Sequence, residues 1–448
     1  MLMKLSNVSV IALHFNNWRN KNISKQIFTN MLAVVIGLGA GVVARVLKWL
    51  IGIVSGFMTS DMTYGGDNLQ LLVLPLAGIL LTALYMRYVL HEDIEDGVEK
   101  LKTSLKAGKS RIPIRMSIAP VIANTLTLGF GGSAGSEGPT AVASAAIASN
   151  VGRCFALSRE DMCMLVACGA GAGIAGIFTA PVGGIFFALE CIHLPMTLSA
   201  VLGLSLSCLT AGVTAFLLAG SSFDVLFPPG MIFDMSNLPI VLALGVFCGL
   251  YSRFYSATGT AARRWIRRHG RIWQRCLISG TVVSVLVFIF PTLYGEGYAS
   301  LTAIVNGMST KIGEGSILYG LASDKWGLTA IVAGIVLVKG VAAYSTNSGG
   351  GVAGDFAPAL FAGCMSGLLF GLFVNNILGT DYPTAHLALI GMSAVLAGVV
   401  RAPLMSIFIA METTNSFGFL VPITVATVIS YMTVHAIDLG LRHAHKRI

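Results

Sequence analysis

The sequence predicts an all-helical protein that crosses a membrane many times and is built from two related halves. Two observations predict the membrane class: the 448-residue chain is 55% hydrophobic and only 11% charged, and its apolar residues form stretches near the ~20 residues that span a bilayer. A third observation, a repeat of glycine-rich stretches, predicts the two halves.

The apolar stretches differ in how completely they exclude charge. Residues 196–220 carry no charged side chain, whereas 71–90 and 33–54 carry charges near one end. Shorter stretches follow the glycine-rich segments and are too short to cross a bilayer alone. We therefore expect roughly ten to fourteen membrane segments, several of them incomplete spans.

The net charge of +9 lies in loops and termini. Two basic clusters stand out, Lys100, Lys102, Lys106, Lys109, Arg111 and Arg115, and Arg263, Arg264, Arg267, Arg268, Arg271 and Arg275. The positive-inside rule places such clusters in the cytoplasm. The partners they predict are anionic lipid headgroups of the bilayer, and nucleic acid is not expected.

The eight cysteines form no CxxC pair and lie mostly in apolar segments, so we interpret them as buried thiols. No metal site, cofactor or disulfide framework is indicated. The polar middle of residues 1–28 argues against a secretory signal and favours a cytoplasmic amphipathic lead-in.

The domain organisation that we predict follows the halves. Residues 29–220 form a first membrane repeat, 221–236 a polar linker containing Pro228-Pro229-Gly230, and 237–440 a second membrane repeat. Residues 441–448 form a basic cytoplasmic tail.

The repeat is visible as identities in one register. Residues Gly391, Ala394, Ala397, Gly398, Ala402, Pro403, Ile407, Phe408, Ala410 and Glu412 match Gly169, Ala172, Ala175, Gly176, Ala180, Pro181, Ile185, Phe186, Ala188 and Glu190. A similar offset lays Gly350, Gly351, Ala353, Gly354 and Pro358 over Gly131, Gly132, Ala134, Gly135 and Pro139. Repeated halves with Gly/Pro-broken segments indicate a transport site near the bilayer midplane.

Glu137 lies in the first of these broken segments, Gly131-Gly132-Ser133-Ala134-Gly135-Ser136-Glu137-Gly138-Pro139-Thr140. An intramembrane carboxylate is costly and usually marks an ion or proton path. Glycines allow the chain to break a helix and to turn N–H groups toward an anion. Two such breaks, one per half, would aim two helix dipoles at one anion, although glycines also serve close helix packing.

These residues resemble the CLC family of chloride channels and chloride/proton antiporters. Gly135-Ser136-Glu137-Gly138-Pro139 is similar to the family's G-x-E-G-P motif, and Gly354-Asp355-Phe356-Ala357-Pro358 to its G-x-F-x-P motif. The stretch from Ala180 to Glu190 and Arg401-Ala402-Pro403 also resemble it, and the similarity covers about residues 33–436. The prokaryotic type without cytoplasmic CBS domains is expected, and with it a bacterial inner membrane.

The resemblance implies a homodimer with one anion pathway per subunit and two inverted-topology repeats whose broken helices meet at a midplane anion site. Glu137 would be the gating glutamate and proton acceptor. Backbone amides would hold chloride or a similar anion at Gly135, Ser136, Gly138, Gly354, Asp355 and Phe356. Glu190 is a candidate proton relay, with a structural role equally open, and no enzymatic activity is expected.

The sequence also departs from the family pattern. The first motif, G-S-G-x-P, is replaced by His91-Glu92-Asp93-Ile94-Glu95-Asp96-Gly97, and the tail lacks the tyrosine of the inner anion site. Cys191 stands where many antiporters have the inner relay glutamate, which favours a passive voltage- or pH-gated channel or a coupled variant that uses water. The short bacterial-like architecture favours the antiporter, which we expect.

Two further interpretations concern residues of the same motifs. An acid beside an anion site is unfavourable unless it is paired or turned away, so we expect Asp355 to cap the following helix. The Phe356 ring would line the pore or pack in the core. Finally, Gly131-Gly132-Ser133-Ala134-Gly135 fits G-x-S-x-G, with His193 downstream, so an intramembrane serine hydrolase is a remote alternative.

Overall fold

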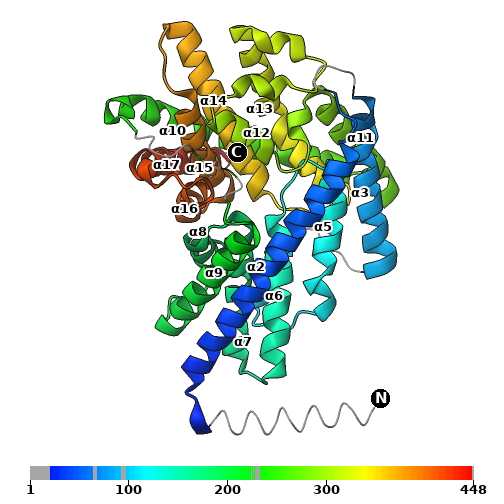
Figure 1. The fold of residues 1–448 in the computed structure, drawn as a ribbon, viewed down its shortest axis with the longest axis vertical. Coiled ribbons are helices and arrows are strands. Elements are labelled where there is room, and N and C mark those ends of the chain that lie inside the picture. Colours follow the sequence, from blue (N-terminus) through cyan, green and yellow to red (C-terminus); the bar gives the residue numbers. More distant parts are fainter. Residues whose placement is uncertain are drawn as a thin grey trace. The chain divides into compact units, whose positions relative to one another are not determined.

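A computed structural model describes residues 21–63, 68–91, 97–222, 225, 227 and 233–445. Residues 92–96 of the departing first motif, most of the lead-in, much of the linker and residues 446–448 of the tail lie outside this description. The described chain is helical throughout apart from loops and turns (Figure 1).

Within the described residues, nine helices are long and apolar enough to cross a membrane. They are Lys25–Met58, Leu69–Leu90, Arg159–Phe178, Leu198–Leu218, Met235–Arg267, Ile272–Ile289, Lys325–Ser348, Phe356–Leu378 and Phe417–Leu441. Pro181–Cys191 and Thr384–Val400 are apolar but shorter. The protein is an all-helical, multi-pass membrane protein.

The helices group into two compact units that are discontinuous in sequence. Unit 1 contains Met1–Val46, Gly97–Val121 and Thr140–Ser221, and unit 2 contains Leu47–Asp96, Ile122–Pro139 and Ser222–Ile448. Helices α2 (Lys25–Met58), α5 (Ala119–Gly129) and α6 (Glu137–Cys154) contribute residues to both units.

Unit 1 is packed through small side chains. Its remaining helices are α4 (Gly97–Lys106), α7 (Arg159–Phe178), α8 (Pro181–Phe186) with a π-helical end (Phe187–Cys191), and α9 (Leu198–Leu218). The core is made mostly of alanine and cysteine: Ala40, Cys168, Ala172, Ala175, Ala188, Leu204, Cys208 and Ala211. Small residues let helix backbones approach closely where the hydrophobic effect cannot drive association.

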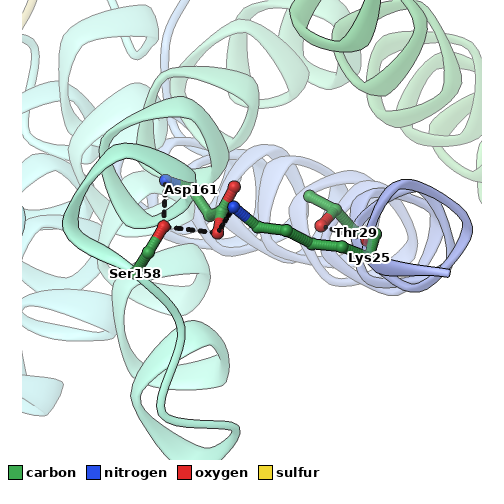
Figure 2. A network of polar contacts seen from close by, with 4 residues as sticks. All are labelled: Lys25, Thr29, Ser158 and Asp161. Atoms are coloured by element: carbon green, nitrogen blue, oxygen red, sulfur yellow. Dashed lines mark hydrogen bonds and ion pairs between the residues drawn. The ribbon is translucent and has the colours of Figure 1, made fainter. Parts of the chain in front are cut away.

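An ion pair joins the first residue of α2 to the first turn of α7 (Figure 2). Nζ of Lys25 lies 2.8 Å from Oδ2 of Asp161. Ser158 caps α7, because its Oγ accepts from the N–H of Asp161 at 3.3 Å and donates to the same carboxylate at 2.5 Å. The N-cap hydroxyl of Ser158 and the ammonium of Lys25 thus meet at the one carboxylate of Asp161.

Unit 2 contains the larger set of helices. They are α3 (Leu74–Leu84) with a π-helical end (Tyr85–Leu90), α10 (Leu238–Arg267), α11 (Ile272–Ile289), α12 (Tyr298–Val305), α13 (Lys325–Ser348), α14 (Phe356–Leu378), α15 (Thr384–Val400), α16 (Pro403–Thr414) and α17 (Leu420–His445). Gly363 of α14 faces Gly391 of α15 so closely that a Cβ on either would overlap the other's carbonyl oxygen. Glycine is therefore required at this helix crossing.

Each unit contains the same helix break. In unit 1, α7 ends at Thr179 with φ 52°, and Ala180 (φ −128°, ψ 81°) leads into Pro181 at the start of α8. In unit 2, α15 ends at Arg401 with φ 67°, and Ala402 has the same φ and ψ before Pro403 starts α16. Proline fits the first helical turn because its missing N–H has no helical partner there.

The expectation of buried thiols is only partly right. All eight cysteines are unbridged; five are buried and two are half-buried. Cys154, however, is exposed at the end of α6, so that part of the prediction is wrong.

Candidate functional site

Two glycine loops of unit 2 are built alike. After α5, Gly131 has φ 94° and the N–H of Gly132 returns to the carbonyl of Thr127 at 2.8 Å. After α13, Gly350 has φ 107° and the N–H of Gly351 returns to the carbonyl of Thr346 at 3.1 Å. Positive φ favours glycine, so both helices can end in this turn.

The two loops are joined by reciprocal hydrogen bonds. The hydroxyl of Thr127 accepts from the N–H of Val352, and the hydroxyl of Thr346 accepts from the N–H of Ser133, each at 3.1 Å. Asn124 also links the two loops, because its Nδ2 donates to the carbonyls of Gly135 at 3.2 Å and Val352 at 2.8 Å. Buried backbone groups are thereby satisfied without a sheet.

Glu137 is the first residue of α6 and only 1% exposed. Its Oε1 accepts a hydrogen bond of 2.5 Å from the N–H of Phe356, the first residue of α14. Its own N–H also donates to the carboxylate. The carboxylate is therefore bound by the positive ends of two helices.

The backbone around this carboxylate has no room for side chains. A Cβ on Gly135 or Gly354 would overlap the Glu137 carboxylate, and one on Gly138 would lie 3.3 Å from Cα of Gly354. Oε2 of Glu137 is buried and has no hydrogen-bond partner among the described residues. A buried carboxylate oxygen without a donor carries a desolvation cost.

A second carboxylate binds at the same helix start. Oε1 of Glu296 accepts from the N–H of Ser136 at 2.9 Å and from its hydroxyl at 2.5 Å. Ser136 directly precedes α6, so Glu296 and Glu137 both engage the loop at this helix N-terminus.

A buried lysine completes the polar cluster. Lys339 of α13 is fully buried; its Nζ donates to Oγ of Ser133 at 2.8 Å and lies 4.7 Å from the ring centroid of Phe361. Its charge attracts that of Glu296. Charges of opposite sign compensate each other more strongly where water is excluded.

Asp355 is paired with side chains and does not cap α14. Its carboxylate accepts from Nδ2 of Asn347 at 2.9 Å and lies 3.8 Å from the guanidinium of Arg263. The Asp355 side chain itself makes no capping bond to α14, so the capping role expected for Asp355 is wrong. The physical reason is that the carboxylate turns toward a cation and an amide on α10 and α13.

A cavity of about 580 Å³ opens beside the second glycine loop. Its lining includes residues 348–352, Arg87 and Arg275. Two cations next to a backbone loop give the cavity a positive lining, which favours anions.

Most of the predicted site residues lie together in unit 2. They are Gly135, Ser136, Glu137, Gly138, Gly354, Asp355 and Phe356. Glu190 lies in unit 1, half-buried in the π-helical end of α8. Within the described residues, no cluster of three or more metal-ligating side chains occurs.

Sequence reasoning missed Glu296, Lys339 and Arg263 as members of the site. Lys339 had a usable signal: it is a charge in the middle of an apolar span, and such residues are functional candidates by default. Glu296 stands in a polar loop, and Arg263 stands in the cluster assigned to lipid headgroups, so neither had a comparable signal.

Helices broken by glycine loops, with a buried carboxylate at their facing N-termini, define a polytopic membrane protein of the ion-transport class. Comparison with known proteins agrees. Residues 77–435 match the voltage gated chloride channel family. The chain is 31% identical to a ClcB-like protein of Ralstonia nicotianae over 380 residues, 82% of each chain. It is 26% identical to the H(+)/Cl(-) exchange transporter ClcA of Vibrio cholerae over 419 residues, 88% of this chain and 84% of that one.

The crystal structure of a slow cyanobacterial Cl−/H+ antiporter superposes with a TM-score of 0.76 and 21% identity, covering 93% of this chain and 96% of that one. This chain therefore belongs to the voltage-gated chloride channel family, the CLC family, and has its fold. Its function is anion transport across a membrane. It is a transport protein rather than an enzyme, so the serine hydrolase alternative is wrong.

Proposed function

We propose that this chain exchanges chloride for protons, with Glu137 as the gate and proton acceptor. The observation that carries the proposal is the hydrogen bond from the N–H of Phe356 to the Glu137 carboxylate. A carboxylate held by helix N-termini mimics a permeant anion. The exchange activity named for the Vibrio relative supports coupling to protons.

Ionised Glu137 occupies the position of the anion and closes the path. Protonation removes its charge, and with it the attraction to the two helix N-termini, so the side chain leaves. Chloride then binds the backbone amides at Ser136 and Gly138 and at Asp355 and Phe356. The N–H groups of Gly135 and Gly354, which the sequence also assigned to the anion, donate to each other's carbonyls instead, so these two glycines leave space for the anion without donating to it. The proton released on return of the side chain completes the exchange.

The site is proposed to lie at the midplane between inverted repeats at 29–220 and 237–440, with 221–236 as linker and 1–28 and 441–448 as cytoplasmic ends. The reciprocal bonds of Thr127 and Thr346 support a two-fold relation of the glycine loops. The equal dihedral angles of Ala180 and Ala402 support equivalent helix pairs.

The protein is proposed to be a homodimer of the bacterial inner membrane, with the basic loops in the cytoplasm. Bacterial relatives support the location. Glu190 is kept as a proton relay because it is an acid in a π-helical segment, adjacent to Cys191.

A passive voltage- or pH-gated channel is the second candidate. Cys191 at the place of the usual relay glutamate favours it, and the same Glu137 gate serves both mechanisms. The two candidates differ in whether chloride movement drives protons.

Proteoliposomes with an outward chloride gradient separate them. Antiport drives protons inward against their own gradient, and Glu137→Gln abolishes this uptake while chloride flux continues. Chloride efflux without proton uptake in the unmodified protein assigns the passive channel. Absence of any chloride flux contradicts the proposed function.

A further inference from the structure

Glu296 holds the same kind of position on Ser136 that Glu137 holds on Phe356. One oxygen of Glu296 receives both the N–H and the hydroxyl of Ser136. Glu137 in turn receives the N–H of Phe356. A carboxylate is thus bound at the backbone of each of the two loops that precede α6 and α14.

The loop that carries Glu296 is fixed in place on both sides. Gly295 and Gly297 have φ of 63° and 83°, a region that favours glycine. A Cβ on Gly297 would overlap the ring of Phe361, and the hydroxyl of Tyr294 donates to the carbonyl of Gly129 at 2.6 Å. The Glu296 side chain is therefore aimed at Ser136 by its backbone.

Charged groups of both signs surround Glu296. Lys339 on α13 attracts it, whereas Glu137 on α6 repels it. Asp355, ahead of α14, adds a negative charge near Glu137, which Arg263 offsets. Because Glu137 and Glu296 repel each other, loss of the charge on one removes the repulsion acting on the other.

We propose that Glu296 is a second gating carboxylate, which occupies the Ser136 amide and hydroxyl while Glu137 occupies the Phe356 amide. An anion fills the site only after both side chains have left. The inference rests on the proposed function, because it assigns a second gate to the same anion site.

The test is chloride flux in proteoliposomes between pH 4.5 and 8.5 for the unmodified protein, Glu137→Gln, Glu296→Gln and the double variant. Glutamine keeps the shape and an acceptor oxygen but has no charge. Glu160→Gln, at an exposed acid in the first turn of α7, is the matched control. Each single variant is expected to keep a shallower pH dependence, and the double variant to have high flux at every pH.

At pH 7.5, Glu296→Gln is expected to raise flux above that of the unmodified protein by about tenfold or more, because a like charge no longer opposes the anion at Ser136. Glu296→Asp keeps the charge but withdraws it from Ser136, and is expected to raise flux as well. This second variant keeps the test decisive if the glutamine variant folds poorly.

The proposal of a second gate is overturned if chloride flux in Glu137→Gln is already independent of pH and equals that of the double variant. The proposal is also overturned if Glu296→Gln lowers flux equally at every pH, because a purely structural role of Glu296 gives that result. Both outcomes leave the proposed function intact. Absence of flux in the unmodified protein removes the proposed function itself, and the second gate with it.

Discussion

Gly135 and Gly354 face each other as an antiparallel backbone pair. The N–H of Gly135 donates to the carbonyl of Gly354 at 3.0 Å, and the N–H of Gly354 donates to the carbonyl of Gly135 at 2.7 Å. Each glycine stands two residues before its helix, so the pair brings together the loops that lead into α6 and α14, and the Glu137 carboxylate lies against both glycines. The position of the gate therefore depends on the absence of two side chains.

Gly354→Ala is expected to lower chloride flux at all pH values. The new Cβ overlaps the place of the Glu137 carboxylate, which is also the proposed place of the anion. Overpacking costs typically ~1–3 kcal/mol, or roughly a five- to hundredfold loss of binding. Chloride flux in proteoliposomes measures this loss. Gly320→Ala is the control, since a Cβ there meets nothing within 4 Å; equal flux in the two variants contradicts the shared position.

Thr127→Val and Thr346→Val are each expected to destabilise the protein. Each change leaves one buried backbone N–H, of Val352 or Ser133, without its acceptor, at a cost of ~1–3 kcal/mol. Thr127→Val costs more, because the Thr127 hydroxyl also lies 3.0 Å from that of Thr82. Thermal unfolding in detergent checks this.

The control for the threonine variants is Thr433→Val, whose hydroxyl bonds the carbonyl of Ile429 on its own helix. It should unfold close to the temperature of the unmodified protein. A loss as large as that of Thr127→Val would show that removal of a helix hydroxyl, rather than the link between loops, causes the effect.

Asp355→Asn and Arg263→Gln are expected to change chloride affinity in opposite directions. Loss of the Asp355 charge removes a negative charge that competes with the anion for the guanidinium, whereas loss of the guanidinium leaves a carboxylate that repels the anion. The pair is partly exposed, so each effect should be about 1 kcal/mol or less, at most about fivefold in Kd.

Chloride titration calorimetry in the Glu137→Gln background measures this effect, because the gate then no longer competes for the site. The Asp355→Asn/Arg263→Gln double variant should return near the starting Kd. Two shifts of the same sign would rule out an electrostatic origin.

Lys25→Met and Ser158→Ala are expected to weaken the α2–α7 attachment in unit 1 by different amounts (Figure 2). The ion pair, in which Lys25 is exposed, contributes ~0–1 kcal/mol and is screened by salt, whereas the N-cap contributes about 0.5–2 kcal/mol. Thermal unfolding at low and high salt separates them. Only the Lys25 effect should shrink with salt; a salt-dependent Ser158 effect contradicts the assignment.

The sequence alone predicted the helical membrane class and the residues of the two broken segments. Charge is costly in a bilayer, and glycine is the residue that permits positive φ, so Glu137 between glycines was a readable signal. The repeat placed Gly354 and Phe356 in the matching stretch. In the structure, Gly354 and Phe356 lie beside Gly135, Ser136 and Glu137, as that repeat predicts.

The tertiary structure alone decided which side chains face these helix starts. Ser136 and Glu296 are 160 residues apart, and Ser133 and Lys339 are 206 apart. No local periodicity encodes such pairs, because they depend on how separate helices pack. The same reason explains Asp355: local propensity predicts a cap, whereas packing offers its carboxylate Arg263 and Asn347 instead.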